Sequence, residues 1–171
     1  MTKKFLVLST LFFSLSLSAH AANEWGIDGE EKARFEVKVV DIACELSGNC
    51  PANCGDGKRQ LGLLKDDGTL LLVAKNLDIF AGGTSDLAPF CQKKIIADGL
   101  LIKNEKMNLF ALQFLRLAPD GEWRKANSFI KNWAKNNPGK DSEEWYRNDP
   151  LVQAEIAKRG VFGIPGVVPE E

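Results

Sequence analysis

Apolar and polar residues alternate with the period of a β-strand in five stretches of the chain. The first covers residues 34–46, and its phase changes at Val39–Val40, which predicts a β-bulge there. The other four are the apolar runs at residues 61–64, 70–74, 95–102 and 109–117. An Asp-Gly turn between the second and third runs is typical of a β-hairpin. The pattern therefore predicts five strands, with a longer connection over residues 75–90 that includes one helical turn.

A helical period replaces the alternation after residue 119. Trp123, Ala126, Ile130 and Trp133 recur at helical spacing, which predicts a helix that ends near Asn136 and packs both tryptophans on the β core. A short helix is expected over residues 141–148. A further helix begins with Asp149 as its N-cap and Pro150 at its first position, and ends at Gly160. Residues 161–171 are expected to form an extended tail, and residues 22–31 a loosely held lead-in.

These elements predict an α+β protein with a mainly β core. The order of the strands resembles that of an OB-fold, a small five-stranded antiparallel barrel, over residues 34–117. The helical region at residues 120–160 is expected to pack on this OB-like core, within one domain that covers residues 22–171. An antiparallel sheet with helices on one face is the alternative. Neither architecture implies a ligand.

The N-terminus has the three parts of a secretory signal peptide. Lys3 and Lys4 form a basic region, an apolar run extends from residue 5 to about residue 18, and Ala19-His20-Ala21 is a cleavage site of small residues. Cleavage after Ala21 removes residues 1–21 and predicts a periplasmic or secreted protein. The apolar run is too short for a bilayer-spanning helix and no longer one follows, so no membrane insertion is expected.

Removal of the signal changes the charge and the available chemistry. Of the 22 basic residues, 20 remain against 23 acidic ones, and the resulting charge of −3 does not favour nucleic acid as a partner. The only histidine, His20, is lost as well. Catalytic triads, Cys-His dyads and histidine-ligated metal centres are thereby excluded from the mature chain. No catalytic motif is found, and we expect a protein that is not an enzyme.

The four cysteines are Cys44, Cys50, Cys54 and Cys91, and in an oxidising compartment they are expected to form two disulfides. The first and fourth strands of an OB-like barrel are antiparallel neighbours. Cys44 ends one of these strands and Cys91 precedes the other, so this fold predicts a Cys44–Cys91 bridge and leaves Cys50 to pair with Cys54. A bridge that closes so short a loop is the more readily reduced of the two.

The segment Cys50-Pro51-x-x-Cys54 resembles the C-P-x-x-C loop of SCO-type copper chaperones over five residues. This resemblance implies a thiol-based accessory protein in which Cys50 and Cys54 bind copper(I) or exchange electrons. The mature chain lacks the histidine that completes the site in that family. Copper(I) can also be held by thiolates alone. A zinc site built from all four cysteines is a further alternative.

Two other groups are candidate binding residues. Lys58, Arg59 and Gln60 follow the cysteine loop and are suited to an anion, although these residues are also consistent with a polar turn. Trp145 and Tyr146 form an aromatic pair at the surface. We therefore expect a disulfide-stabilised, non-catalytic binding or accessory module without a cofactor. It presents residues 50–60 and the barrel face to another envelope protein or a small ligand.

Overall fold

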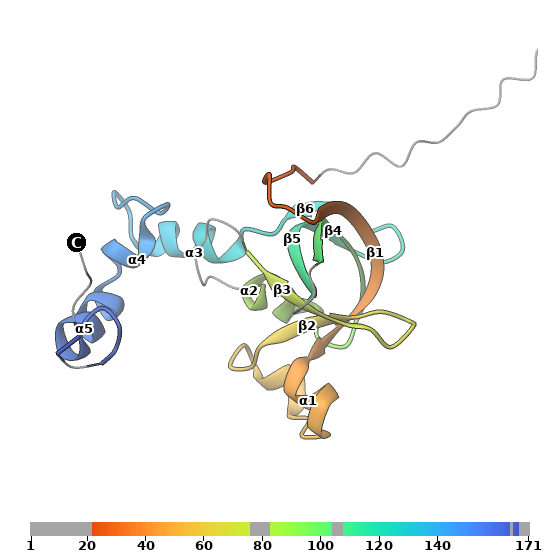
Figure 1. The fold of residues 1–171 in the computed structure, drawn as a ribbon, viewed down its shortest axis with the longest axis horizontal. Helices are drawn as coiled ribbons and strands as arrows, with labels where there is room; N and C mark the ends of the chain where they lie inside the picture. The colour runs from red at the N-terminus through yellow and green to blue at the C-terminus, as the bar shows by residue number, and fades with distance from the viewer. Residues whose placement is uncertain (1–21, 76–82, 104–107, 165, 168–171) are drawn as a thin grey trace, which may run out of the picture.

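The computed structural model describes residues 22–75, 83–103, 108–164 and 166–167. The fold is α+β, with a closed five-strand mixed barrel and a few helices (Figure 1). The barrel strands are β1 (Glu30–Asp41), β2 (Leu61–Leu64), β3 (Leu70–Ala74), β4 (Lys94–Lys103) and β5 (Asn108–Leu117). A two-residue strand, β6 (Arg124–Lys125), pairs with β5. Each of the five predicted strands thus has a counterpart in the barrel, although the first was expected over residues 34–46 and residues 42–46 form a helix instead.

The barrel closes through a parallel contact between β3 and β5. The sheet order is β3-β2-β1-β4-β5, and the neighbours in this order are antiparallel. Four reversals of direction separate β3 from β5, so these two strands run the same way and can pair only in parallel. The expectation of a wholly antiparallel barrel is therefore corrected. An odd number of strands cannot close a barrel by antiparallel contacts alone.

The alternation in β1 directs its apolar side chains into the barrel. Val37 and Val39 are fully buried and join a core to which Ile95, Phe110 and Leu115 also belong.

The predicted bulge at Val39–Val40 is wrong, because β1 pairs with β2 in continuous register there. The register instead shifts between β4 and β5 at Asp98–Gly99. A Cβ atom on Gly99 would lie 2.2 Å from the carbonyl oxygen of Ala111, so glycine permits the close approach of the two strands.

Short helices occupy the two long connections of the barrel. The connection from β1 to β2 contains α1 (Ile42–Ser47) and the 3-10 turn η1 (Ala52–Gly55). The described part of the connection from β3 to β4 contains α2 (Thr84–Leu87) and η2 (Ala88–Phe90), which agrees with the helical turn expected there. The first connection carries three of the four cysteines and is called the cysteine loop, residues 42–60.

The helices of the C-terminal third are α3 (Ser128–Asn136), α4 (Trp145–Asn148) and α5 (Pro150–Arg159). We call residues 128–167, as far as they are described, the C-terminal arm. Its first helix is attached to the barrel connection, because the backbone N–H of Ser128 donates to Asp86 of α2 at 2.9 Å. Figure 1 shows α4 and α5 lying away from the barrel. The division into domains stays a prediction.

Two expectations from the sequence are corrected at the ends of the core. The predicted helix at residues 123–136 begins only at Ser128, because Arg124 and Lys125 pair with β5. Trp123 is accordingly 41% exposed, and Trp133 is buried but is not among the buried residues that form the barrel core. The lead-in before β1 is held firmly rather than loosely: Ala22 is buried, and side chains of the barrel and of Glu30 bind residues 22–26. In the described ranges, no helix is both long and apolar enough to cross a bilayer.

Candidate functional site

The cysteine loop is closed by disulfides that differ from the predicted pairing. Cys44 is bonded to Cys50, and Cys54 is bonded to Cys91. The predicted Cys44–Cys91 and Cys50–Cys54 bridges are therefore wrong. The first bridge stays within the loop, whereas the second joins the loop to the segment before β4. Cys54 is 3% exposed and belongs to the barrel core, so this second bridge forms part of the core packing.

The pairing differs because Cys44 lies in a helix and not at the end of a strand. Asp41 caps α1 by accepting a hydrogen bond from the backbone N–H of Cys44 at 3.2 Å. Gly48 ends the helix in the left-handed conformation, which glycine adopts without strain. The helix turns Cys44 toward Cys50. An aspartate followed seven residues later by a glycine was the signal in the sequence that could have revealed this helix.

Lys58, Arg59 and Gln60 lie at the end of the cysteine loop, and the charge of Arg59 is used within the loop. A terminal guanidinium nitrogen of Arg59 lies 3.8 Å from the buried carboxylate of Asp41, and the other donates to Asn49 at 3.3 Å. Lys58 and Gln60 are exposed. Arg59 thus stabilises the loop, and the group does not form a converging anion site.

Metal binding or electron exchange by Cys50 and Cys54 needs free thiols, and both cysteines are bonded in disulfides. Cys50 and Cys54 belong to different disulfides, so copper(I) or zinc could bind both sulfurs only after two bridges were reduced. Within the described ranges, no three His, Cys, Asp or Glu side chains are grouped to hold a metal ion. The resemblance to copper chaperones is limited to the five residues from Cys50 to Cys54.

Trp145 and Tyr146 belong to the arm, apart from the cysteine loop (Figure 1). The ring of Trp145 meets Phe129 edge-on at 4.7 Å and also contacts Tyr146 at 6.2 Å. Both residues of the predicted pair are half-buried. Trp145 therefore joins α4 to α3, and the pair contributes to the packing of the arm.

A second contact fixes the start of α5. The indole N–H of Trp133 donates to Asp149 at 2.7 Å, and the other carboxylate oxygen of Asp149 accepts from the backbone N–H groups of Leu151 and Val152. The indole hydrogen bond, with those two backbone groups, lowers the pKa of Asp149 below its ordinary value, although partial burial acts in the opposite direction. Asp149 thus links α3 to α5, and its role as N-cap, predicted from the sequence, agrees with this geometry.

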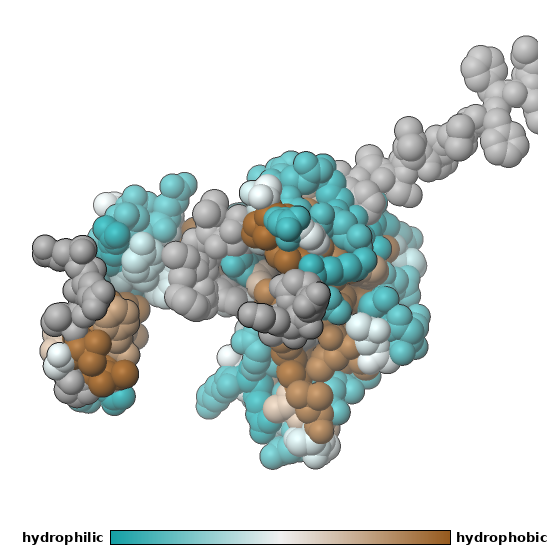
Figure 2. Space-filling model, viewed as in Figure 1, coloured by the Kyte–Doolittle hydropathy of each residue, from teal (hydrophilic) through white to brown (hydrophobic). Residues whose placement is uncertain are grey.

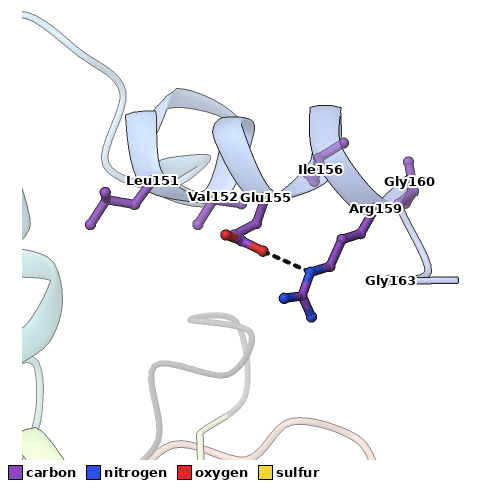
Figure 3. Close-up of a pocket in the computed structure, with 8 residues that line it drawn as sticks. Leu151, Val152, Glu155, Ile156, Arg159, Gly160 and Gly163 are labelled. Atoms are coloured by element: carbon purple, nitrogen blue, oxygen red, sulfur yellow. Dashed lines mark ion pairs between the residues drawn. The ribbon is translucent and has the colours of Figure 1, made fainter. Parts of the chain in front are cut away.

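The arm carries an open groove between α5 and the turn that follows it. The chain reverses at Gly160, whose left-handed backbone lets residues 161–164 fold back beside the helix. The groove has a volume of about 400 Å³, and Val152, Ile156 and Val161 contribute to its largely apolar lining. Figure 3 shows one ion pair beside it, in which Arg159 and Glu155 are 3.1 Å apart. The pair is an ordinary i, i+4 contact on the helix surface.

Apolar side chains are unusually exposed around this groove. Of the nine large apolar residues that are exposed in the described ranges, five lie in α5 or in the turn after it: Leu151, Val161, Phe162, Ile164 and Val167. Their exposed fractions range from 44% to 80%. Figure 2 shows this apolar surface on the arm, and a second apolar area around α1, where Leu46 is 75% exposed. Clustered apolar exposure with a polar rim is typical of a docking surface.

Comparison with known proteins adds no relative. No family model matches the chain, and no match is found among curated proteins or among solved structures. The candidate site therefore rests on geometry. The sequence pattern predicted only an extended tail over residues 161–171 and did not reveal this surface, although Val161, Phe162 and Ile164 are apolar.

Proposed function

We propose that the protein is an exported, non-catalytic binding module that docks through its C-terminal arm on an apolar segment of another envelope protein. The observation that carries this proposal is the cluster of exposed apolar side chains on α5 and the following turn. Leaving such a cluster in water is unfavourable by about 25 cal/mol per Å² relative to burial, so a partner that covers it gains affinity. The two disulfides are compatible with an oxidising compartment.

A protein segment fits this surface better than a lipid bilayer does. Helices that lie on membranes carry many Lys and Arg residues on their polar face. The polar residues of α5 include Glu155 as well as Lys158 and Arg159, and the exported chain as a whole is acidic. An apolar centre with a rim of both charges is instead common in protein interfaces.

We also infer that the barrel is OB-like. The support is the circular strand order β1-β2-β3-β5-β4 together with the parallel contact of β3 and β5. In OB-folds the face of strands 2 and 3 and the loops beside it are common binding surfaces. Fold likeness alone does not identify a ligand, so the barrel face is the weaker candidate surface.

The proposal is tested by comparing three forms of the full-length protein, exported in its own host and cross-linked before purification. They are the wild type, Phe162→Ser combined with Ile164→Ser, and Leu46→Ser as a matched change at the other exposed apolar area. We expect one envelope protein to be recovered with the wild type and with Leu46→Ser, and its yield to fall at least about tenfold with the arm variant. Equal recovery with all three forms, or a loss only with Leu46→Ser, would contradict the proposal.

Two controls separate other occupants of the groove. Wild-type protein is mixed with vesicles of phosphatidylethanolamine and phosphatidylglycerol and floated on a density gradient, and its mass in solution is measured by light scattering. We expect it to stay with the soluble fraction and to be monomeric. Flotation that the arm variant abolishes would mean that the groove binds membranes, and a dimer that the arm variant dissociates would mean that it binds a second copy. Either result overturns the assignment of the partner.

A further inference from the structure

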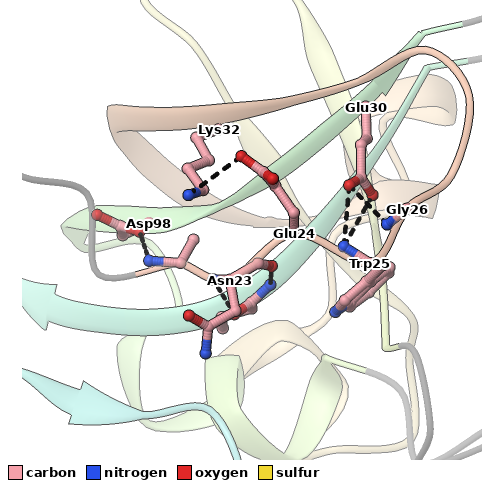
Figure 4. Close-up of polar contacts among 9 residues, drawn as sticks. Asn23, Glu24, Trp25, Gly26, Glu30, Lys32 and Asp98 are labelled. Carbon is pink, nitrogen blue, oxygen red and sulfur yellow. Dashed lines mark hydrogen bonds and ion pairs between the residues drawn. The ribbon is translucent and has the colours of Figure 1, made fainter.

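The residues that follow the predicted cleavage point are bound one after another by side chains of the barrel. Asn23 is held through both backbone groups: its N–H donates to Gln113 of β5 at 2.9 Å, and its carbonyl oxygen accepts from the same side chain at 2.7 Å. Glu30 accepts from the backbone N–H groups of Trp25 and Gly26, both at 2.9 Å (Figure 4). The segment therefore has one defined path across the barrel.

Glu30 takes part in this arrangement as a charged group. Burial acts to raise its pKa, but the backbone N–H groups of Gly26, Ile27 and Trp25 outweigh that effect and lower the pKa below its ordinary value. A segment that donates several backbone hydrogen bonds to one carboxylate is held in one conformation.

The path begins at a buried carboxylate. Ala22 is 2% exposed, and its backbone nitrogen lies 3.0 Å from Oδ1 of Asp98, which is fully buried in β4 (Figure 4). The other oxygen of Asp98 accepts from Nε of Arg34 at 2.7 Å and also contacts a terminal nitrogen of the same guanidinium. The two carboxylate oxygens thus serve different partners, one of which is the nitrogen at the predicted start of the mature chain.

We infer that Asp98 is the binding site for the amino group that signal cleavage creates at Ala22. Hydrolysis of the bond between Ala21 and Ala22 consumes one water molecule and leaves a carboxylate on Ala21. The nitrogen of Ala22 becomes an amine, which takes up a proton at neutral pH. The same nitrogen that donates one amide hydrogen in the precursor becomes an ammonium group with three donors and a positive charge. Cleavage therefore gives the donor of this hydrogen bond a positive charge and converts an amide-to-carboxylate bond into an ion pair.

The site is suited to an ammonium group. An ammonium donor adds Coulomb attraction to a hydrogen bond whose acceptor is a carboxylate, and a buried position with a low local dielectric strengthens this attraction. Arg34 is 27% exposed and also lies over the ring of Trp123 at 5.0 Å, so its charge is shared between Asp98, this ring and water. A carboxylate accepts donors at both oxygens independently. Signal cleavage thus adds the amine of Ala22 as a charged partner to the buried contact of Asp98 with Arg34. This ion pair fixes the N-terminal segment against β4.

This inference rests on the export part of the proposed function and is independent of docking by the arm. The first experiment is the intact mass of protein exported in its own host, which should correspond to a chain that begins at Ala22. The second uses protein released from a fusion partner with either Ala22 or Gly-Ser-Ala22 at its start. From urea unfolding, we expect the equilibrium constant for folding to be about tenfold larger for the protein with the free Ala22 amine.

Two variants show whether this difference comes from Asp98. Asp98→Asn removes the charge and keeps an oxygen acceptor. In this variant, the protein that begins at Ala22 and the protein that begins with Gly-Ser-Ala22 should have equal stability. In Glu36→Gln, which neutralises an exposed carboxylate of β1 that pairs with Lys94, the tenfold difference should persist. A difference that persists in Asp98→Asn would mean that the added residues act by crowding, and would overturn the inference.

Acylation of the folded protein tests the same site without a variant. An amine-reactive anhydride modifies exposed amines, and mass spectrometry of peptides compares the α-amine of Ala22 with the exposed Lys94. We expect the α-amine to react at least about tenfold more slowly in the folded protein than in urea, because the ion pair with Asp98 keeps it protonated and a protonated amine is not nucleophilic. Equal rates, or a mature chain that begins elsewhere, would contradict the inference.

Discussion

Three aspartates are buried in the described part of the molecule, and each fixes a junction between elements. Asp41 caps α1 and contacts Arg59, and Asp98 binds Arg34 and the nitrogen of Ala22. Asp86 pairs with Lys75 at 2.9 Å and accepts from the start of α3. Buried charges are costly unless they are paired, so these side chains determine how the connections attach to the barrel.

Removal of the Asp86 carboxylate should be strongly destabilising. The side chain of Lys75 is only 7% exposed, and Asp86→Ala would leave its charge buried without this partner. We expect the free energy of unfolding to fall by about 3 kcal/mol, measured by urea unfolding. Asp67→Ala is the matched control, because Asp67 forms an ion pair with Lys65 at the same distance of 2.9 Å but is exposed. Similar losses in both variants would contradict this account.

Asp149 should make the arm sensitive to acid. Its pKa is lowered in the folded protein, so it stabilises the arm above the ordinary aspartate pKa of about 3.9, and this contribution is lost as the pH falls from there through the lowered value. We expect the indole N–H resonance of Trp133 to shift and the amides of α5 to lose protection from hydrogen exchange below about pH 4. In Asp149→Asn this transition should be absent. An identical transition in both proteins would show that another group is responsible.

At the scale of elements, the two disulfides should contribute unequally to stability. The Cys54–Cys91 bridge closes a sequence separation of 37 residues, and the Cys44–Cys50 bridge one of 6. On the chain-entropy model these loops correspond to about 4 and about 2 kcal/mol respectively. We therefore expect Cys54→Ser with Cys91→Ser to lower the urea midpoint more than Cys44→Ser with Cys50→Ser. The reverse order would mean that the cysteine loop, and not its link to β4, stabilises the barrel.

The strands were predictable because alternation reports burial on one face, and each barrel strand contributes to the core. The cysteine pairing was not predictable in the same way. It depends on whether Cys44 ends a strand or lies in α1, and the six residues of α1 are too few for a periodic signal. The course of residues 22–29 was missed for a related reason. Polar side chains such as Gln113 and Glu30 hold this segment, and polarity alone is typical of a loop.

At the scale of the whole molecule, the sequence predicted the parts better than their arrangement. Five strands that close into a barrel require one parallel contact, and the contact between β3 and β5 joins residues far apart in the chain. The helical period of residues 123–136 predicted that Trp123 and Trp133 pack on the β core, but Trp123 is exposed and the indole of Trp133 bonds to Asp149 at the start of α5. The apolar residues after Gly160 gave no sign of whether they pack on the barrel or stay exposed, since that depends on where α5 lies.

We propose that the arm docks on an apolar segment of another envelope protein. The most direct measurement is photo-crosslinking in intact cells, with a benzophenone amino acid at position 162 in one protein and at position 46 in a second. We expect position 162 to give one adduct, which mass spectrometry maps to an apolar segment of a single envelope protein, and position 46 not to give it. An adduct only from position 46, or adducts at position 162 only with lipid or with a second copy of this chain, would contradict the account.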